Sequence, residues 1–271
     1  MNKIINFGLT ILILLIAAPV SGAKKERAYM SINFIDYVGN YKVVEVSLKT
    51  KKDGKFVPLK KQSIQIAMIM EEGDSLLASV TTDQKGIANL AIEPDFKFIK
   101  NKKGYFKLKA SFKGNKTLKK AKKTFKAREL KFKSDFLEQD NIKEVQVRAS
   151  EINVNNEEIL PKEVKIGLYV ERLFTDFKIA EQKLKDGFIK FEIPQNISGD
   201  ENGNIHLKVK IVDNKYYGNI IVGKLLQWGK PVVAEDLSQR RFKAASYLNF
   251  MILSIIILSV FGLFMYRKKT N

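Results

Sequence analysis

The stretch Tyr105–Lys113, YFKLKASFK, decides the fold class of this chain. Apolar residues occupy every second position from Phe106 to Phe112, and lysine or serine fills the positions between them. A β-strand points successive side chains to opposite faces, so this pattern predicts one face in a core and the other in water. Short alternating runs of this kind fill residues 24–228. This part of the chain shows no convincing amphipathic helix. This organisation predicts an all-β sandwich.

The alternating runs recur about 100 residues later in the chain. KVVEVSLK at Lys42–Lys49 matches KEVQVRAS at Lys143–Ser150, and the turn glycines Gly86 and Gly187 are 101 residues apart. The run Ile205–Ile211 likewise matches the one quoted above. Matched blocks in the same order with one offset indicate a tandem duplication. Each copy has about seven short strands in about 100 residues, which is the size of an immunoglobulin-like sandwich.

The motif order of the first copy provides a family resemblance. A proline, Pro58, precedes the alternating strand Ser63–Met70, and the turn Thr81–Gly86 (TTDQKG), the tripeptide Lys103–Tyr105 and the pair Gly114-Asn115 follow. This order resembles bacterial Ig-like and invasin-type extracellular domains, and also macroglobulin-like β-sandwiches. The second copy fits more loosely, because its turn is LKDG and it has no Gly-Tyr. The resemblance implies spacer, adhesion or protein-contact modules outside the cytoplasm, without an active site.

The N-terminal 23 residues have the pattern of a signal peptide. Lys3 forms a short basic region, an apolar run from Phe7 to Ala18 follows, and Ser21–Ala23 supplies small residues for cleavage. An uncleaved anchor helix is the alternative. Either reading exports the chain that follows residue 23.

A second apolar run, Tyr247–Tyr266, contains no charged residue and is followed by Arg267-Lys268-Lys269. About 20 helical residues span roughly 30 Å, the thickness of the hydrocarbon core of a bilayer. The run therefore predicts a single membrane-spanning helix, and a buried core helix is the alternative. Three basic residues flank it on each side, so the exported N-terminus, not the charge bias, places the body outside and the tail in the cytoplasm.

Together these features predict two tandem Ig-like β-sandwiches and one C-terminal transmembrane helix. The predicted boundaries are 1–23 for the signal peptide, 24–128 and 129–228 for the two sandwiches, 229–246 for a juxtamembrane linker, 247–266 for the membrane span and 267–271 for a cytoplasmic tail. Trp228, the only tryptophan, is expected to plug the base of the second sandwich.

Positive charge is concentrated in one part of the chain. The formal net charge is +19, and residues 97–133 carry 15 Lys and one Arg against the single acidic residue Glu129. A concentrated basic face attracts anions. We expect it to meet an anionic phospholipid headgroup, an anionic envelope polymer or an acidic envelope protein; nucleic acid is disfavoured, because the aromatic residues are used in the core. The alternative is a lysine-rich proteome that fills surface positions with lysine. The candidate residues are Lys107, Lys109, Lys113, Lys116, Lys119, Lys120, Lys122 and Lys123.

No catalytic constellation, cofactor motif or metal site emerges from the sequence. The chain has no cysteine and only one histidine, His206, on the strand face opposite Ile205 and Leu207. The acidic segment Asp200–Asn204 lacks the glycine and glutamate spacing of a calcium-binding EF-hand loop and is expected to be a turn. We therefore expect no enzyme and no cofactor.

The leading hypothesis is a non-enzymatic, membrane-tethered protein of the cell envelope that binds or positions another component outside the cytoplasmic membrane. The alternative is an accessory or assembly subunit of a multi-subunit transport or respiratory complex, whose helix packs against others. Helix interfaces of that kind favour small residues, and Ser254, Ser259 and Gly262 are present without forming G-x-x-x-G.

Overall fold

The computed structural model describes residues 25–232, so the predicted signal peptide, membrane span and tail lie outside the described residues. Residues 25–232 form strands and connections, and they contain no helix long and apolar enough to cross a membrane. The predicted all-β class is thus confirmed for the described chain. The strands are β1 (Ala28–Tyr37), β2 (Tyr41–Lys52), β3 (Lys55–Pro58), β4 (Ser63–Met70), β5 (Gly73–Thr81), β6 (Ile87–Ile92), β7 (Tyr105–Phe112), β8 (Ala121–Arg128), β9 (Leu130–Gln139), β10 (Ile142–Ile152), β11 (Glu158–Ile159), β12 (Lys165–Glu171), β13 (Asp176–Lys183), β14 (Phe188–Glu192), β15 (Ile205–Asn214) and β16 (Gly218–Leu226).

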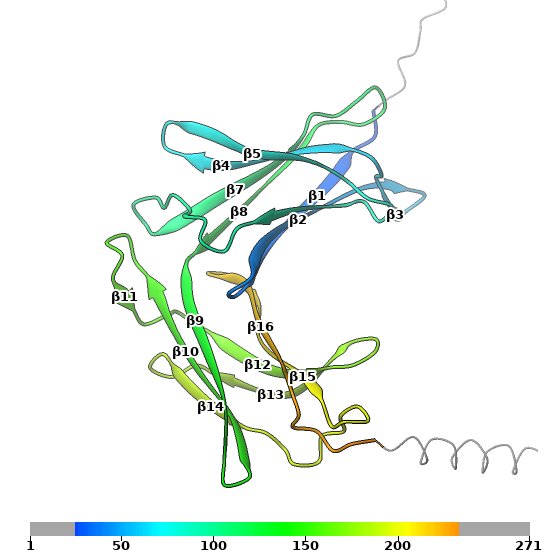
Figure 1. Ribbon diagram of the computed structural model, residues 1–271. Coiled ribbons are helices and arrows are strands. Elements are labelled where there is room, and N and C mark those ends of the chain that lie inside the picture. Colours follow the sequence, from blue (N-terminus) through cyan, green and yellow to red (C-terminus); the bar gives the residue numbers. More distant parts are fainter. Residues whose placement is uncertain (1–24, 233–271) are drawn as a thin grey trace, which may run out of the picture. The chain divides into compact units, whose positions relative to one another are not determined.

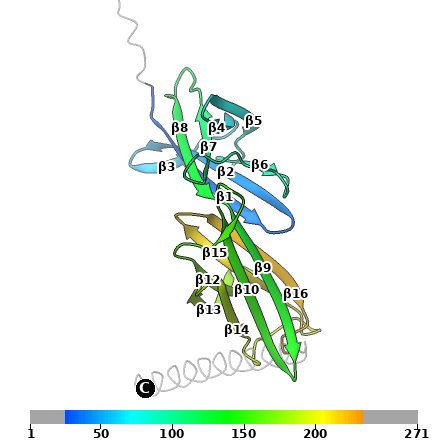
Figure 2. The ribbon, with the colours of Figure 1, turned by 90° about the vertical axis from the view of Figure 1, so that its left-hand side faces the viewer.

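The described chain divides into two compact units. The first consists of residues up to Glu129 together with Lys215–Gly218, and the second begins at Leu130. In the first unit, β2 pairs with β1, β3 and β6, and a separate sheet has the order β5-β4-β7-β8 (Figures 1 and 2). The division between the predicted sandwiches, after residue 128, lies next to this boundary; the domain assignment itself stays a prediction.

The second unit repeats the strand pairing of the first. Here β10 pairs with β9, β11 and β14, and the strands β13, β12, β15 and β16 follow one another in a sheet. Each strand of the second unit therefore has the same pairing partners within its unit as the strand numbered eight lower has in the first unit. The predicted tandem repetition is confirmed at the level of topology.

The core of the first unit lies between its two sheets. Alternate residues of β7, from Phe106 to Phe112, are buried, and those between them are partly exposed, as the alternating pattern predicted. Their neighbours include Val44 and Val46 of β2 and Ile66 of β4, all at 0% exposure. An equivalent set of aliphatic residues from β10, β12 and β15 is buried in the second unit.

The turn glycines of the two units, Gly86 and Gly187, accept equivalent backbone hydrogen bonds. The Leu48 N–H group donates to the Gly86 carbonyl at 2.8 Å, and the Ala149 N–H group donates to the Gly187 carbonyl at 2.9 Å. Both glycines have a φ of +72°, a conformation in which residues with a Cβ are strained. The positive φ, and not the hydrogen bond, explains why both turns need a glycine.

The lone tryptophan closes one end of the second unit. Trp228 is 6% exposed, and its ring centroid is 6.4 Å from that of Phe136. The Lys143 ammonium donates to the Trp228 carbonyl at 3.2 Å. Trp228 is thus packed into the second unit, as its predicted role as a plug requires.

Candidate anionic-partner surface

The basic segment forms β7, β8 and the connection between them. Lys107 and Lys109 lie on β7, Lys122 and Lys123 lie on β8, and the other four candidate lysines lie in the connection, residues 113–120. These eight lysines are called the basic face below. All of them belong to the first unit.

Three of these lysines, Lys107, Lys109 and Lys122, lie on the outward side of the β7–β8 ladder. Residues directly opposite each other in an antiparallel pair share a face. Lys107 stands opposite Lys126, and Lys122 stands opposite Ser111. The Lys126 ammonium also lies 5.5 Å from the centroid of the Tyr105 ring. Because like charges directly opposite each other are unfavourable, the Lys107–Lys126 pair favours an anion that would relieve their repulsion.

Two candidate lysines differ from this arrangement. Lys109 forms an ion pair with Asp74, so its charge is already compensated. Lys123 stands opposite Ala110, which is completely buried, and therefore belongs to the core side of the sheet although its own side chain is exposed. The structure thus brings Lys107 and Lys122 together on one side and sets Lys123 on the other.

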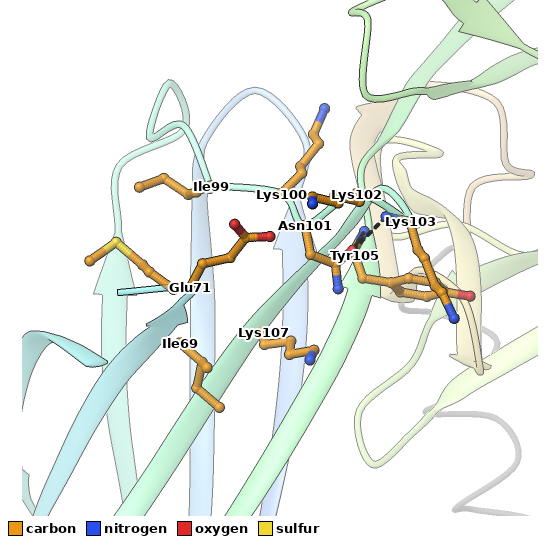
Figure 3. A pocket seen from close by; sticks show the side chains of 10 residues that line it. Ile69, Glu71, Ile99, Lys100, Asn101, Lys102, Lys103, Tyr105 and Lys107 are labelled. Carbon is orange, nitrogen blue, oxygen red and sulfur yellow. Dashed lines mark hydrogen bonds between the residues drawn. The ribbon is translucent and has the colours of Figure 1, made fainter. Parts of the chain in front are cut away.

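A hollow of about 440 Å³ lies at one end of this ladder. We call it the loop hollow; it is lined by Ile69, Met70, Glu71, Tyr105, Lys107 and residues 99–103 (Figure 3). Its loop is fixed by Asn101, whose side-chain oxygen accepts hydrogen bonds from the Lys103 and Tyr105 N–H groups at 3.0 and 3.1 Å. Figure 3 shows the Glu71 carboxylate among the lysine side chains, so this hollow has mixed charge.

A second hollow, of about 570 Å³, has a more uniform charge. We call it the edge groove; it is lined by residues 27–30 and 119–122. Arg27, Lys119, Lys120 and Lys122 all line it, and no carboxylate does. Two backbone hydrogen bonds hold its walls together: Glu26 N–H donates to the Thr117 carbonyl, and Lys119 N–H donates to the Glu26 carbonyl, both at 2.8 Å. The groove is therefore a firmly built cationic surface.

The charges of the basic face are mostly uncompensated within the molecule. Among residues 25–232, Lys109 is the only member of the basic face that forms an ion pair. Lys100, which lies outside the set, is paired with Glu129 at 2.7 Å. The face can therefore act as a binding surface for an anion without first breaking internal salt bridges.

Two cations that belong to this surface are not among the eight predicted lysines. Arg27 lines the edge groove, and its guanidinium lies 5.1 Å from the centroid of the Tyr29 ring. Lys126 completes the pair with Lys107. Lys126 could have been found, since it lies in the same basic segment, but Arg27 is about 90 residues away and no local pattern connects it to β8.

The remaining candidates for chemistry have structural roles. The Asp200 Oδ1 atom accepts hydrogen bonds from the Asn202 and Asn204 N–H groups at 2.9 and 2.7 Å, as expected for a turn. The Asn204 side-chain amide also donates to Asp200 Oδ2 at 2.9 Å, and this bond, together with the backbone ones, holds the pKa of Asp200 below its ordinary value. His206 is partly exposed and its Nδ1 atom contacts the Glu171 carboxylate. Within the described chain, no group of three or more His, Cys, Asp or Glu residues is arranged to hold a metal ion.

Comparisons with known proteins give only distant structural similarity. No protein-family model matches the chain, and no curated protein matches its sequence. A tetra-tandem repeat from the extending region of a large adhesion protein is 10% identical, with a TM-score of 0.27, over 74% of this chain and 49% of that one. A DUF3823 family protein from Bacteroides ovatus is 14% identical, with a TM-score of 0.26, over 73% and 98% of the two chains. The FN1–FN3 domains of chicken CNTN1 are 9% identical, with a TM-score of 0.28, over 75% and 68%.

Proposed function

We propose that this chain is a non-enzymatic protein of the cell envelope, tethered to the membrane by Tyr247–Tyr266, whose first unit binds an anionic partner. The observation that carries the proposal is the uncompensated charge on the outward side of β7–β8 and in the edge groove. Lys107, Lys122 and Lys126 lie there without ion pairs among the described residues, and Arg27 joins them in the groove. The apolar run supports tethering, because it is long enough to span a bilayer.

The partner is recognised by charge and not by a shaped pocket. Neither hollow is enclosed, and lysine presents a flexible point charge instead of the fixed fork of arginine. Such a surface suits a polymer or a lipid headgroup layer that carries many anionic groups. Each lysine that approaches an anionic surface contributes about 1 kcal/mol.

A matched pair of charge reversals tests the proposal. The full chain, held in nanodiscs of phosphatidylcholine, is titrated with fluorescently labelled heparin as a generic polyanion, and binding is followed by anisotropy. The variant K107E/K126E reverses the directly opposed lysine pair on the outward side of β7 and β8. The control K165E/K183E reverses an equally opposed lysine pair on β12 and β13 of the second unit.

Both variants change the net charge by the same amount, so they separate location from total charge. We expect K107E/K126E to weaken binding about tenfold or more and the control to weaken it much less. Higher salt should weaken binding of the unmodified chain, because exposed charges are screened. Equal weakening by both variants would show that only net charge matters and would contradict the proposal.

A further inference from the structure

The turn between β12 and β13 exposes apolar side chains to an unusual degree. Leu173 is 88% exposed and Phe174 is 93% exposed, more than any other large apolar side chain in residues 25–232. Phe177, near the start of β13, is 63% exposed. Tight turns usually carry polar residues or glycine. Two adjacent apolar residues at a hairpin tip therefore indicate a surface that meets an apolar environment.

This tip lies at the end of the second unit from which the chain continues toward its C-terminus. The Arg172 guanidinium, at the base of the tip, donates to the Ser198 carbonyl at 2.9 Å. Ser198 forms a β-bridge with Lys230, only two residues before the last described residue. The segment around Ser198 thus connects the hairpin tip to the chain exit.

Glycines allow the backbone segments of this connection to approach one another closely. A Cβ atom on Gly229 would lie 2.7 Å from the backbone of Gly199, and one on Gly199 would lie 2.5 Å from the backbone of Gly203. The Lys230 N–H group donates to the Ile197 carbonyl at 2.7 Å. This backbone packing fixes the position of the exit relative to the tip.

The sequence that follows brings this end of the unit close to a membrane. Only residues 233–246 separate the described chain from the apolar run Tyr247–Tyr266. Even fully extended, 14 residues reach no more than about 50 Å. Arg172 adds a cation next to the tip, where it can reach lipid phosphates while the apolar side chains go deeper.

We propose that Leu173 and Phe174 insert into the interface of the bilayer that holds Tyr247–Tyr266, so that the second unit contacts the membrane through its β12–β13 hairpin. The proposal rests on the membrane tethering proposed above. The partner of the hairpin tip is the lipid surface itself, because the tip and the chain exit share one end of the unit. The linker between that exit and the apolar run, residues 233–246, is also short. Apolar side chains placed at the headgroup boundary bind in proportion to the apolar area that they bury.

The absence of cysteine from the chain allows a direct test. The full chain with Phe174→Cys, labelled with the environment-sensitive dye NBD, is reconstituted into vesicles of phosphatidylcholine and phosphatidylglycerol. Nitroxide groups on the upper acyl chain of added lipids report contact by quenching. The control is Val154→Cys, because Val154 is also exposed, at 48%. Val154 follows the end of β10 that pairs with Leu130. The other end of β10 carries Lys143, which contacts Trp228 close to the chain exit.

We expect blue-shifted, quenched emission from the dye at position 174 and water-like, unquenched emission from the dye at position 154. Leu173→Ser in the labelled chain should lower the ratio of membrane-inserted to water-exposed tips about tenfold. Flotation of the chain with the vesicles reports tethering separately, so a failed anchor is distinguished from a tip that stays out. Unquenched emission at position 174 in floated vesicles would overturn the proposal. So would protection of the dye in native membranes but not in lipid vesicles, since it would indicate a protein partner.

Discussion

The ammonium of Lys100 lies 2.7 Å from the carboxylate of Glu129, and only 12% of the lysine side chain is exposed. Glu129 is the one acidic residue in the basic segment 97–133. Its charge is therefore committed to a largely buried lysine and does not offset the exposed ones. This pair explains how so basic a segment folds while its outward lysines keep their charge available.

Glu129→Gln should destabilise the first unit, because it removes the Glu129 carboxylate from its ion pair with the largely buried Lys100 ammonium. We expect the free energy of unfolding to fall by about 1 kcal/mol. This is less than the loss for a fully buried ion pair, because the Glu129 side chain is 42% exposed. Thermal unfolding of the full chain, followed by circular dichroism, measures it. The control is Glu181→Gln, which breaks an exposed pair with Lys178 at the same 2.7 Å distance and should cost less than about 0.5 kcal/mol. Equal losses would show that burial of Lys100 is unimportant.

Gly86→Ala should destabilise the turn that precedes β6. The new Cβ atom would lie 2.6 Å from the Leu48 carbonyl oxygen, which already accepts a hydrogen bond from the Leu59 N–H group at 3.0 Å and cannot easily move. We expect a cost of about 3 kcal/mol and faster amide hydrogen exchange in β2 and β6. Gly54→Ala is the matched control, since Gly54 also has positive φ but nothing lies within 4 Å of the added atom.

The control should cost only about 1–2 kcal/mol, the strain of the left-handed backbone alone. A larger effect at position 54 than at position 86 would contradict the steric explanation. Gly187→Ala should resemble Gly86→Ala, because its Cβ would lie 2.9 Å from the Ala149 carbonyl oxygen.

Acid should weaken the second unit through Asp176. Burial alone would raise the pKa of this carboxyl, but the Lys210 and Lys208 ammonium groups beside it hold the pKa below its ordinary value. A carboxyl whose pKa is lower in the folded state stabilises the fold above its unfolded pKa, near 4. That stabilisation is lost as the pH falls through the lower, folded pKa.

Melting temperatures of the full chain between neutral pH and about pH 3 measure this loss. Asp176→Asn should lower stability at neutral pH and reduce its dependence on acid. Asp53→Asn, in the turn between β2 and β3, is the control for the loss of one carboxyl, since Asp53 forms no ion pair within residues 25–232. A profile that is identical for Asp176→Asn and the unmodified chain would exclude Asp176 as the responsible group.

Much of the fold could be predicted because alternation is strong in central strands. β7 has neighbours on both sides, so each of its residues is either in the core or in water, and the sequence shows this period of two directly. The repetition was predictable for a related reason. Gly86 and Gly187 meet the same backbone constraint in both units, and few other residues satisfy it.

The candidate surface was less predictable because β8 ends its sheet. Of its eight residues only Ala127 is buried, so lysines occur on both faces and the alternation is lost. Lysines that look alike in the sequence therefore separate in space, as Lys122 and Lys123 do. Arg27 joins them through backbone pairing between Glu26 and residues 117–119, a long-range contact that has no local signal.

The position of Lys123 has a consequence for how copies of this chain can meet. β8 is the last strand of its sheet, and an end strand can pair through its backbone with a strand of another molecule. A lysine on the core side of such a strand would have to give up its water if another strand docked there. We therefore expect Lys123 to disfavour edge-to-edge pairing between two copies of this chain.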